Sequence, residues 1–176
     1  MKKVLSWMAS VRTCVMLSLN CMAGLAMATP CLIDYIESDG SQYVDTGIVG
    51  KSGTKIQLDF MLMEAKSGTD YGVLGCRAST ATDSRFFPVH FYGSKVGYGY
   101  GTWVSSDPEF HINAGTRYSM TSDFGVGAQI LDFEDRRVMM KTWTTVVDTQ
   151  RNLYLFACNV AGTPSYFAKV RLYGLK

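Results

Sequence analysis

The sequence lacks the features that mark several large classes of protein. Residues 29–176 contain no run of lysine or arginine, no Cys-x-x-Cys pair, and no apolar stretch long enough to cross a membrane. The missing basic patch excludes a nucleic-acid-binding protein, because such proteins neutralise phosphates with clustered cations. A zinc site is not expected either, since the only histidines are His90 and His111.

Sustained helical periodicity is also missing, so no crossover helix is expected to join parallel strands. Apolar and polar residues alternate instead, and this two-residue period is typical of half-buried strands. In one such strand the apolar face carries Ile56, Leu58, Phe60 and Leu62, opposite Lys55, Gln57 and Asp59. Further runs cover 71–76, 86–92, 95–103, 116–124, 128–133, 137–141, 152–158 and 167–175. Many short strands separated by turn residues predict an all-β sandwich or barrel with antiparallel sheets.

The first 28 residues read as a secretory signal peptide. Lys2 and Lys3 provide a basic start, residues 13–28 are uncharged and mostly apolar, and the small residues of Ala-Met-Ala precede a cut between Ala28 and Thr29. The apolar stretch is shorter than the roughly 20 residues of a membrane-spanning helix. We therefore expect residues 1–28 to be removed and 29–176 to form one exported domain, either secreted or periplasmic.

Removal of this segment changes the charge and the cysteine count. The basic residues fall from 17 to 14 against 15 acids, so the formal charge changes from +2 to −1. Cys31, Cys76 and Cys158 remain. A bridge between Cys76 and Cys158 is the preferred pairing in an oxidising compartment. The alternative, in which both are small buried residues that stay reduced, is left open.

One hairpin can be predicted in register. A two-residue turn at Gly93-Ser94 pairs Tyr92 with Lys95 and His90 with Gly97. One face then carries the core residues Phe87, Val89, Phe91, Val96, Tyr98 and Tyr100. The other carries His90, Tyr92, Lys95, Gly97, Gly99 and Gly101, a shallow glycine floor that a flat ligand can approach. Tolerance of strong twist is the alternative explanation of these glycines.

The candidate ligand-binding residues are His90 and Tyr92, which edge this floor, and Trp103. Trp103 ends a predicted strand and precedes the polar loop Ser-Ser-Asp-Pro. A tryptophan in this position either stacks on a sugar ring or caps the core at the edge of the sandwich.

Residues 35–47, Tyr-Ile-Glu-Ser-Asp-Gly-Ser-Gln-Tyr-Val-Asp-Thr-Gly, carry a family resemblance. With the strand at 54–64, Val73-Leu74-Gly75-Cys76-Arg77, Asn152-Leu153-Tyr154-Leu155-Phe156-Ala157 and the segment 165–175, they resemble the concanavalin A-like, laminin-G-like jelly-roll domains of bacterial exported and phage structural proteins. The resemblance spans residues 33–176. It implies two packed antiparallel sheets, one of them often concave and able to bind glycans or to act as an adhesive surface. Such relatives usually continue beyond the strand at 169–175, so the domain is either truncated there or leaves an edge strand open to a partner.

Few residues of the sequence support a catalytic alternative. Some members of the superfamily are glycosidases, which use two nearby carboxylates, and Asp132 and Glu134 are the closest pair of that kind. They adjoin Arg136 and Arg137 at a predicted hairpin turn, which favours a solvated turn. No Gly-x-Ser-x-Gly elbow is present, and no basic motif adjoins a cysteine.

Calcium is a further alternative, because laminin-G-like relatives sometimes bind it through aspartates and backbone oxygens. The loop acids of this chain are scattered, namely Asp39, Asp70, Asp83 and Asp107. They form no calcium-loop motif, so no cofactor is predicted, although a calcium site is left open.

The sequence as a whole favours an exported, non-enzymatic recognition or adhesion module. Its expected partner is a glycan or a cell-surface protein, and carbohydrate binding is the leading interpretation. A structural or assembly role through an open sheet edge is the alternative from another class, and a glycoside hydrolase is the third.

Overall fold

The computed structural model describes residues 33–80, 85–105, 110–125, 128–134, 136–142 and 147–176. The predicted signal peptide, its cut between Ala28 and Thr29, and Cys31 lie outside these residues, as do Asp83 and Asp107. Within the described ranges, all of the helix or strand structure is β-strand. The all-β prediction is therefore confirmed.

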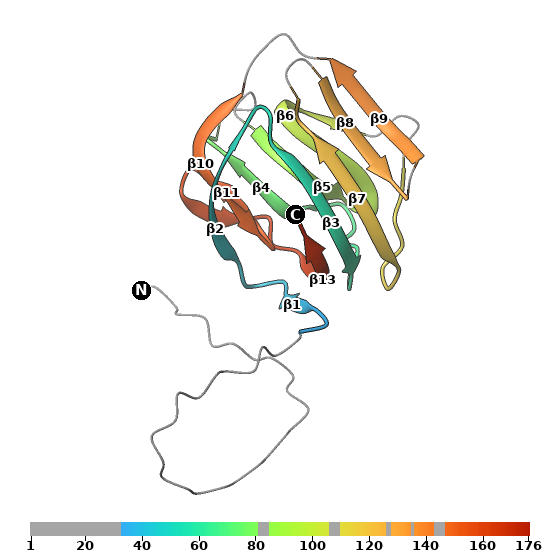
Figure 1. The fold of residues 1–176 in the computed structure, drawn as a ribbon. Coiled ribbons are helices and arrows are strands. Elements are labelled where there is room, and N and C mark those ends of the chain that lie inside the picture. The colour runs from blue at the N-terminus through green and yellow to red at the C-terminus, as the bar shows by residue number, and fades with distance from the viewer. Residues whose placement is uncertain (1–32, 81–84, 106–109, 126–127, 135, 143–146) are drawn as a thin grey trace, which may run out of the picture.

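Two largely antiparallel sheets pack face to face as a sandwich (Figure 1). The six-stranded sheet has the order β1 (Ile36–Asp39), β13 (Lys169–Leu175), β3 (Lys55–Leu62), β7 (Arg117–Asp123), β8 (Ala128–Phe133) and β9 (Arg136–Thr142). The seven-stranded sheet contains β12 (Thr163–Ser165), β11 (Cys158–Val160), β4 (Asp70–Arg77), β10 (Asp148–Leu155) and β2 (Val44–Lys51), with β5 (Arg85–Tyr92) and β6 (Lys95–Ser105) joined through β4.

The core fills the space between the sheets with aromatic and aliphatic side chains. The predicted apolar face of β3 is buried throughout, whereas Lys55 and Gln57 are exposed. Phe60 of β3 meets Phe91 of β5 with ring centroids 6.0 Å apart, and Phe86 meets Phe124 at 4.4 Å. These contacts join the two sheets, and each fully buried apolar side chain stabilises the fold by about 1.5–3 kcal/mol.

The β5–β6 hairpin keeps the predicted register only near its turn. Tyr92 pairs with Lys95 and His90 with Gly97, as expected, but a bulge between Phe87 and His90 shifts the rest by one residue. Phe87 therefore leaves the core face and stacks on His90, which corrects its predicted position. Pro88 lies inside the bulge, where its missing N–H costs no ladder hydrogen bond, and its carbonyl accepts a hydrogen bond from Ser122 Oγ.

One pair of strands departs from the expected antiparallel arrangement. β11 runs parallel to β4, with Cys158 opposite Gly75. β10, the strand before it, is antiparallel to β4 at Leu155. The chain therefore reverses at Phe156, whose φ of 68° permits a tight turn. Because the parallel segment spans only three residue pairs and follows this reversal, no crossover helix is needed.

The last strand, β13, is not an open edge. It pairs with β1 on one side, where Arg171 lies opposite Glu37, and with β3 on the other. The open edge that the resemblance implied beside residues 169–175 is thus occupied by β1.

Candidate functional site

A small cavity of about 350 Å³ lies on the outer face of the seven-stranded sheet. We call it the Tyr92 cavity. Its lining comes from the start of β4, from the outward residues of the β5–β6 hairpin and from the turn before β13: Asp70, Arg85, Phe87, His90, Tyr92, Lys95 and Tyr166. Two of the three predicted ligand-binding residues, His90 and Tyr92, are therefore brought together.

Tyr92 provides the accessible aromatic surface of this cavity. It ends β5, and 48% of it is exposed. Large aromatic residues are seldom left open to water, because burying them is strongly favourable. Trp103, the third predicted residue, belongs to β6, but its side chain lies outside what the structure describes. Its role in binding stays a prediction.

Aromatic rings, rather than bare glycine, form the floor of the cavity. Phe87 and His90 are buried and stack with centroids 4.8 Å apart, and Tyr166 meets His90 edge-on at 5.7 Å. Gly99 does face this side, as predicted, but a Cβ there would come within 3.1 Å of the Phe87 ring. The predicted open glycine floor is thus wrong: the bulge turns Phe87 over it.

His90 links the cavity to the interior through a Cys-His-Asp series. Its Nε2 lies 3.2 Å from Asp70 Oδ1, and its Nδ1 lies 3.8 Å from Cys158 Sγ. Because an ionised carboxylate only accepts hydrogen bonds, the ring proton is assigned to Nε2. Burial lowers the pKa of His90, and the hydrogen bond from His90 lowers the pKa of Asp70. A neutral imidazole therefore donates to a charged carboxylate.

This series resembles a thiol-hydrolase triad in its order but does not present a nucleophile. Cys158 is fully buried, and that burial raises the pKa of its thiol well above the usual value. The reactive form of cysteine is the thiolate, which needs an electropositive and accessible setting. The thiol is therefore a packing group beneath the cavity.

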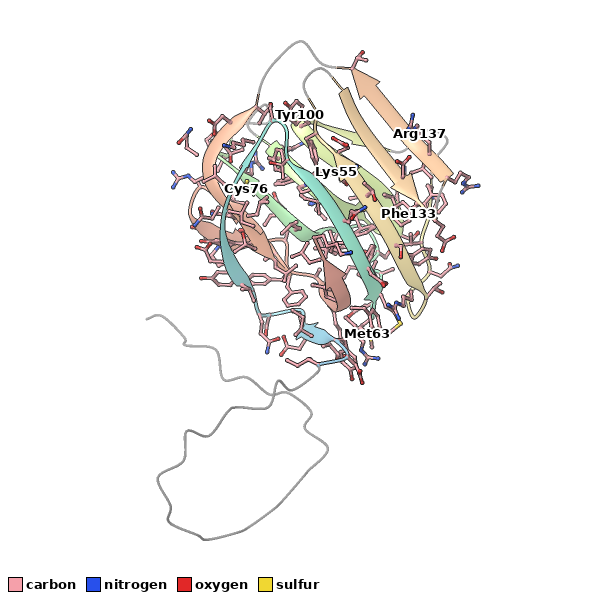
Figure 2. The ribbon with its side chains drawn as sticks, viewed as in Figure 1. Lys55, Met63, Cys76, Tyr100, Phe133 and Arg137 are labelled. Carbon is pink, nitrogen blue, oxygen red and sulfur yellow. The ribbon has the colours of Figure 1, made fainter. Side chains whose placement is uncertain are left out.

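The predicted Cys76–Cys158 bridge is not formed, and the geometry explains why. Both thiols are free and buried. Cys76 (labelled in Figure 2) points into the core beside Phe86 and Leu153, whereas Cys158 lies on the outer side of the sheet below His90. Side chains on opposite faces of a sheet cannot meet in a disulfide without backbone movement. The alternative that the sequence left open, two buried thiols, describes the structure.

The polar rim of the cavity carries charges of both signs. Among its lining residues, Arg85 and Lys95 are cations and Asp70 is an anion, which accepts a hydrogen bond from His90 and also interacts electrostatically with Arg85. Arg85 Nε is shut off from solvent and has no hydrogen-bond partner. Among the residues that the structure describes, Arg85 also forms no ion pair. The sequence analysis did not identify Arg85, Phe87 or Tyr166 as residues of the cavity. Pro88 inside a strand was the one sequence signal of the bulge that places Phe87 there.

A second, open hollow lies on the outer face of the six-stranded sheet. It contains Asp132 and Glu134, the carboxylates considered for glycosidase chemistry. Asp132 accepts a hydrogen bond from Arg137 Nε at 3.3 Å, and Glu134 is exposed at the β8–β9 turn with φ of 47°. Arg137 lies on this hairpin at the edge of the molecule (Figure 2). An ion-paired aspartate and an exposed turn glutamate match the solvated turn predicted from the sequence.

The acids considered for calcium lie in separate places. Asp39 is on β1 and accepts hydrogen bonds from Ser41, while Asp70 is on β4 and accepts one from His90. Within the described ranges, no group of three His, Cys, Asp or Glu side chains is placed to hold a metal ion. Within the same ranges, no helix has the length and apolar character that crossing a membrane requires.

Comparison with known proteins identifies solved structures of similar fold. The sequence matches no protein-family model and no curated protein. Among solved structures, the CBM40 module of the Ruminococcus gnavus IT-sialidase bound to α2,3-sialyllactose superposes with a TM-score of 0.63 at 9% identity, covering 82% of this chain and 89% of that one. The same module bound to α2,6-sialyllactose gives 0.57 at 10% identity, covering 80% and 90%. Domains LG4–5 of the mouse laminin α1 chain give 0.53 at 16% identity, covering 78% and 40%. The chain thus shares its sandwich fold with a carbohydrate-binding module and with laminin G-like domains.

Proposed function

We propose that this protein is an exported, non-catalytic carbohydrate-binding module of the concanavalin A-like, laminin-G-like type, and that glycan binds in the Tyr92 cavity. The observation that carries the proposal is the exposed Tyr92 ring beside a concave site floored by Phe87 and His90. Ligand sites combine apolar and aromatic walls with a few polar groups that orient the ligand. A sugar ring has an apolar face for Tyr92 and hydroxyl groups for the polar rim.

Two solved structures of similar fold support a glycan as the ligand class. The Ruminococcus gnavus module has been solved with α2,3- and with α2,6-sialyllactose. The shared fold raises the expectation of glycan binding, but the site itself has to be argued from this chain's own residues. That is why the proposal rests on the Tyr92 cavity rather than on the likeness.

The surroundings of the candidate catalytic side chains favour a binding role over catalysis. The buried Cys158 thiol is protonated and covered, and Glu134 is an exposed turn residue. Export, to the periplasm or outside the cell, is part of the proposal and rests on residues 1–28. The glycan is then one met outside the cytoplasm, either free or displayed on a cell-surface protein.

A glycan array probed with the purified protein, with and without calcium, tests the proposal. We expect specific binding that falls about tenfold on Tyr92→Ala, because the stacking surface is lost. Tyr35→Ala is the matched control: Tyr35 is 37% exposed but lies outside the cavity, so binding should persist. A folded protein that binds no glycan would favour the assembly role instead.

Assays of the same purified protein distinguish glycan binding from glycan hydrolysis. Asp132→Asn and Glu134→Gln should leave glycan affinity unchanged, because both residues lie on the opposite sheet from the Tyr92 cavity. No sugar release is expected from the bound glycans before or after these changes. Hydrolysis that disappears on either substitution would establish the glycosidase alternative.

A further inference from the structure

We infer that the Tyr92 cavity binds a neutral sugar ring, which stacks on Tyr92 and donates hydrogen bonds from its hydroxyl groups to the Asp70 carboxylate. The inference rests on the proposed function and adds the chemical class of the sugar and the residue that selects it. Asp70 and Tyr92 both line the cavity and lie on neighbouring strands, β4 and β5.

Asp70 is the direct cross-strand neighbour of Tyr92. The first residue of β4 lies opposite the last residue of β5. Residues that lie opposite each other in an antiparallel pair have Cβ atoms roughly 4.5–5.5 Å apart. One sugar ring stacked on Tyr92 therefore has hydroxyl groups within reach of the Asp70 carboxylate. Arg85 lies at the other end of β5 and takes no part in this contact.

The Asp70 carboxylate keeps one oxygen atom for a ligand. His90 donates to Oδ1 at 3.2 Å, and within the described residues no hydrogen bond to Oδ2 is formed. The Asp70 side chain is 47% exposed, so the carboxylate is open to the cavity. The hydrogen bond from His90 lowers the pKa of Asp70, which is therefore ionised at neutral pH. An ionised carboxylate only accepts hydrogen bonds, and a sugar hydroxyl group is a matching donor.

The carboxylate is also held in place before a ligand binds. His90 is buried and stacks on Phe87, which restricts rotation of the ring that donates to Asp70. The backbone near the start of β4 is fixed as well, because the Gly72 N–H donates to the Tyr166 carbonyl at 2.7 Å. An acceptor that is already oriented loses little conformational freedom when the sugar binds, and this favours affinity.

The charges beside Tyr92 favour a neutral sugar. Asp70 flanks Tyr92 on β4 and Lys95 flanks it on β6, so an anion and a cation lie on its two sides. A sugar carboxylate at Tyr92 would be repelled by Asp70 while it is attracted by Lys95. Neutral hydroxyl groups both donate and accept, so they avoid this conflict. The volume of about 350 Å³ is near the small end of ligand pockets, roughly 300–1,000 Å³, and suits a single sugar ring.

Calorimetric titration of the purified protein tests the inference. The probes are lactose, maltose and α-mannobiose, the monodeoxy analogues of each, and α2,3-sialyllactose as an acidic sugar. At least one neutral disaccharide should bind, and removal of a hydroxyl group that donates to Asp70 should weaken its binding roughly 10- to 100-fold. α2,3-Sialyllactose should bind no more tightly than lactose, which it contains.

Substitution of Asp70 then assigns the effect to this residue. Asp70→Asn keeps an oxygen for the hydrogen bond from His90 but replaces the second carboxylate oxygen with an NH₂ donor. Binding of the unmodified sugar should weaken roughly 10- to 100-fold. The deoxy analogue should lose no further affinity in this variant, because the partner of its missing hydroxyl group is already gone.

Asp148→Asn is the matched control. Asp148 is an exposed aspartate of β10 in the same sheet, lies outside the cavity, and also accepts a side-chain hydrogen bond, from Gln150 at 2.7 Å. Its substitution should leave binding as in the parent protein. Asp70→Glu provides a second variant should Asp70→Asn fail to show a cooperative melt. It keeps the charge but moves the carboxylate by one methylene group, so binding should again weaken.

The results distinguish this inference from the proposed function. Binding of a neutral sugar that is lost in Tyr92→Ala but unchanged in both Asp70 variants would overturn the role of Asp70 and keep a carbohydrate-binding cavity. Tighter binding of α2,3-sialyllactose than of lactose, also lost in Tyr92→Ala, would overturn the neutral class in the same way. If a cooperatively melting protein binds none of these sugars, both proposals are overturned.

Discussion

The buried His90 ring donates a hydrogen bond from Nε2 to the Oδ1 of Asp70, 3.2 Å away, and joins the interior of the sheet to the rim of the cavity. His90 is 2% exposed, whereas 47% of the Asp70 side chain is exposed. The two residues come from neighbouring strands, β5 and β4. Burial of the imidazole makes this pair sensitive to acid.

Stability should fall as the solution is acidified below the ordinary pKa of histidine. Burial lowers the pKa of His90 below 6.5, so below that value the unfolded chain binds a proton that the folded chain does not. Folding stability from this group is complete above about pH 6.5 and is lost progressively as pH falls toward the lowered pKa. The pKa of Asp70 is lowered from 3.8, so its own contribution is lost only in stronger acid.

Urea unfolding between about pH 7 and pH 5 measures this effect. His90→Gln, which keeps an amide donor but does not titrate, should flatten the pH dependence over this range. His111→Gln, at an exposed histidine, should leave it as it is in the parent protein. If the free energy of unfolding of His90→Gln varies with pH as steeply as that of the parent protein, groups other than His90 cause the pH dependence.

Cys76 and Cys158 should resist alkylation in the native protein. Burial raises the pKa of Cys76 to about 11 and that of Cys158 well above its usual value, so neither forms an accessible thiolate at neutral pH. Peptide mapping after iodoacetamide treatment should find both unmodified in buffer and both modified in denaturant. Adding a reductant should not lower the melting temperature. A mapped Cys76–Cys158 disulfide would contradict the arrangement of the two sheet faces.

Gly72→Ala should destabilise the protein by about 1–3 kcal/mol or more, because a Cβ would lie 2.2 Å from Cys158 Sγ. Strand β4 has little room to shift, since the Gly72 N–H donates to the Tyr166 carbonyl at 2.7 Å. Denaturant melts should show partial recovery in Gly72→Ala/Cys158→Ala, where the clashing sulfur is removed. Gly174→Ala is the control, because a Cβ there meets only an ordinary contact of 3.6 Å. Equal losses at the two glycines would argue against the close packing beneath the cavity.

The amino-acid sequence by itself determined most of the longer strands, the faces of β3, and the hairpin near Gly93-Ser94. It did not predict β1, β2 or β12, and the run 152–158, expected as one strand, is divided at Phe156 between β10 and β11. Alternation along a strand is a local property, so it can be read without knowing what the strand packs against. Placing His90 and Tyr92 on one outward face followed from the same periodicity and the even turn length. The buried state of Cys76 and Cys158 was one of the two alternatives that their apolar neighbours allowed.

Only the tertiary structure decided which residues form the cavity. The bulge at Pro88 brought Phe87 onto the face of His90, and a one-residue shift of this kind reverses every side chain beyond it. Cys158 and Asp70 are separated from His90 by 68 and 20 positions in the chain and meet it through the pairing of β4 with β5 and with β11. Local periodicity carries no information on such pairings, because they depend on which strands become neighbours when the two sheets bury their apolar faces.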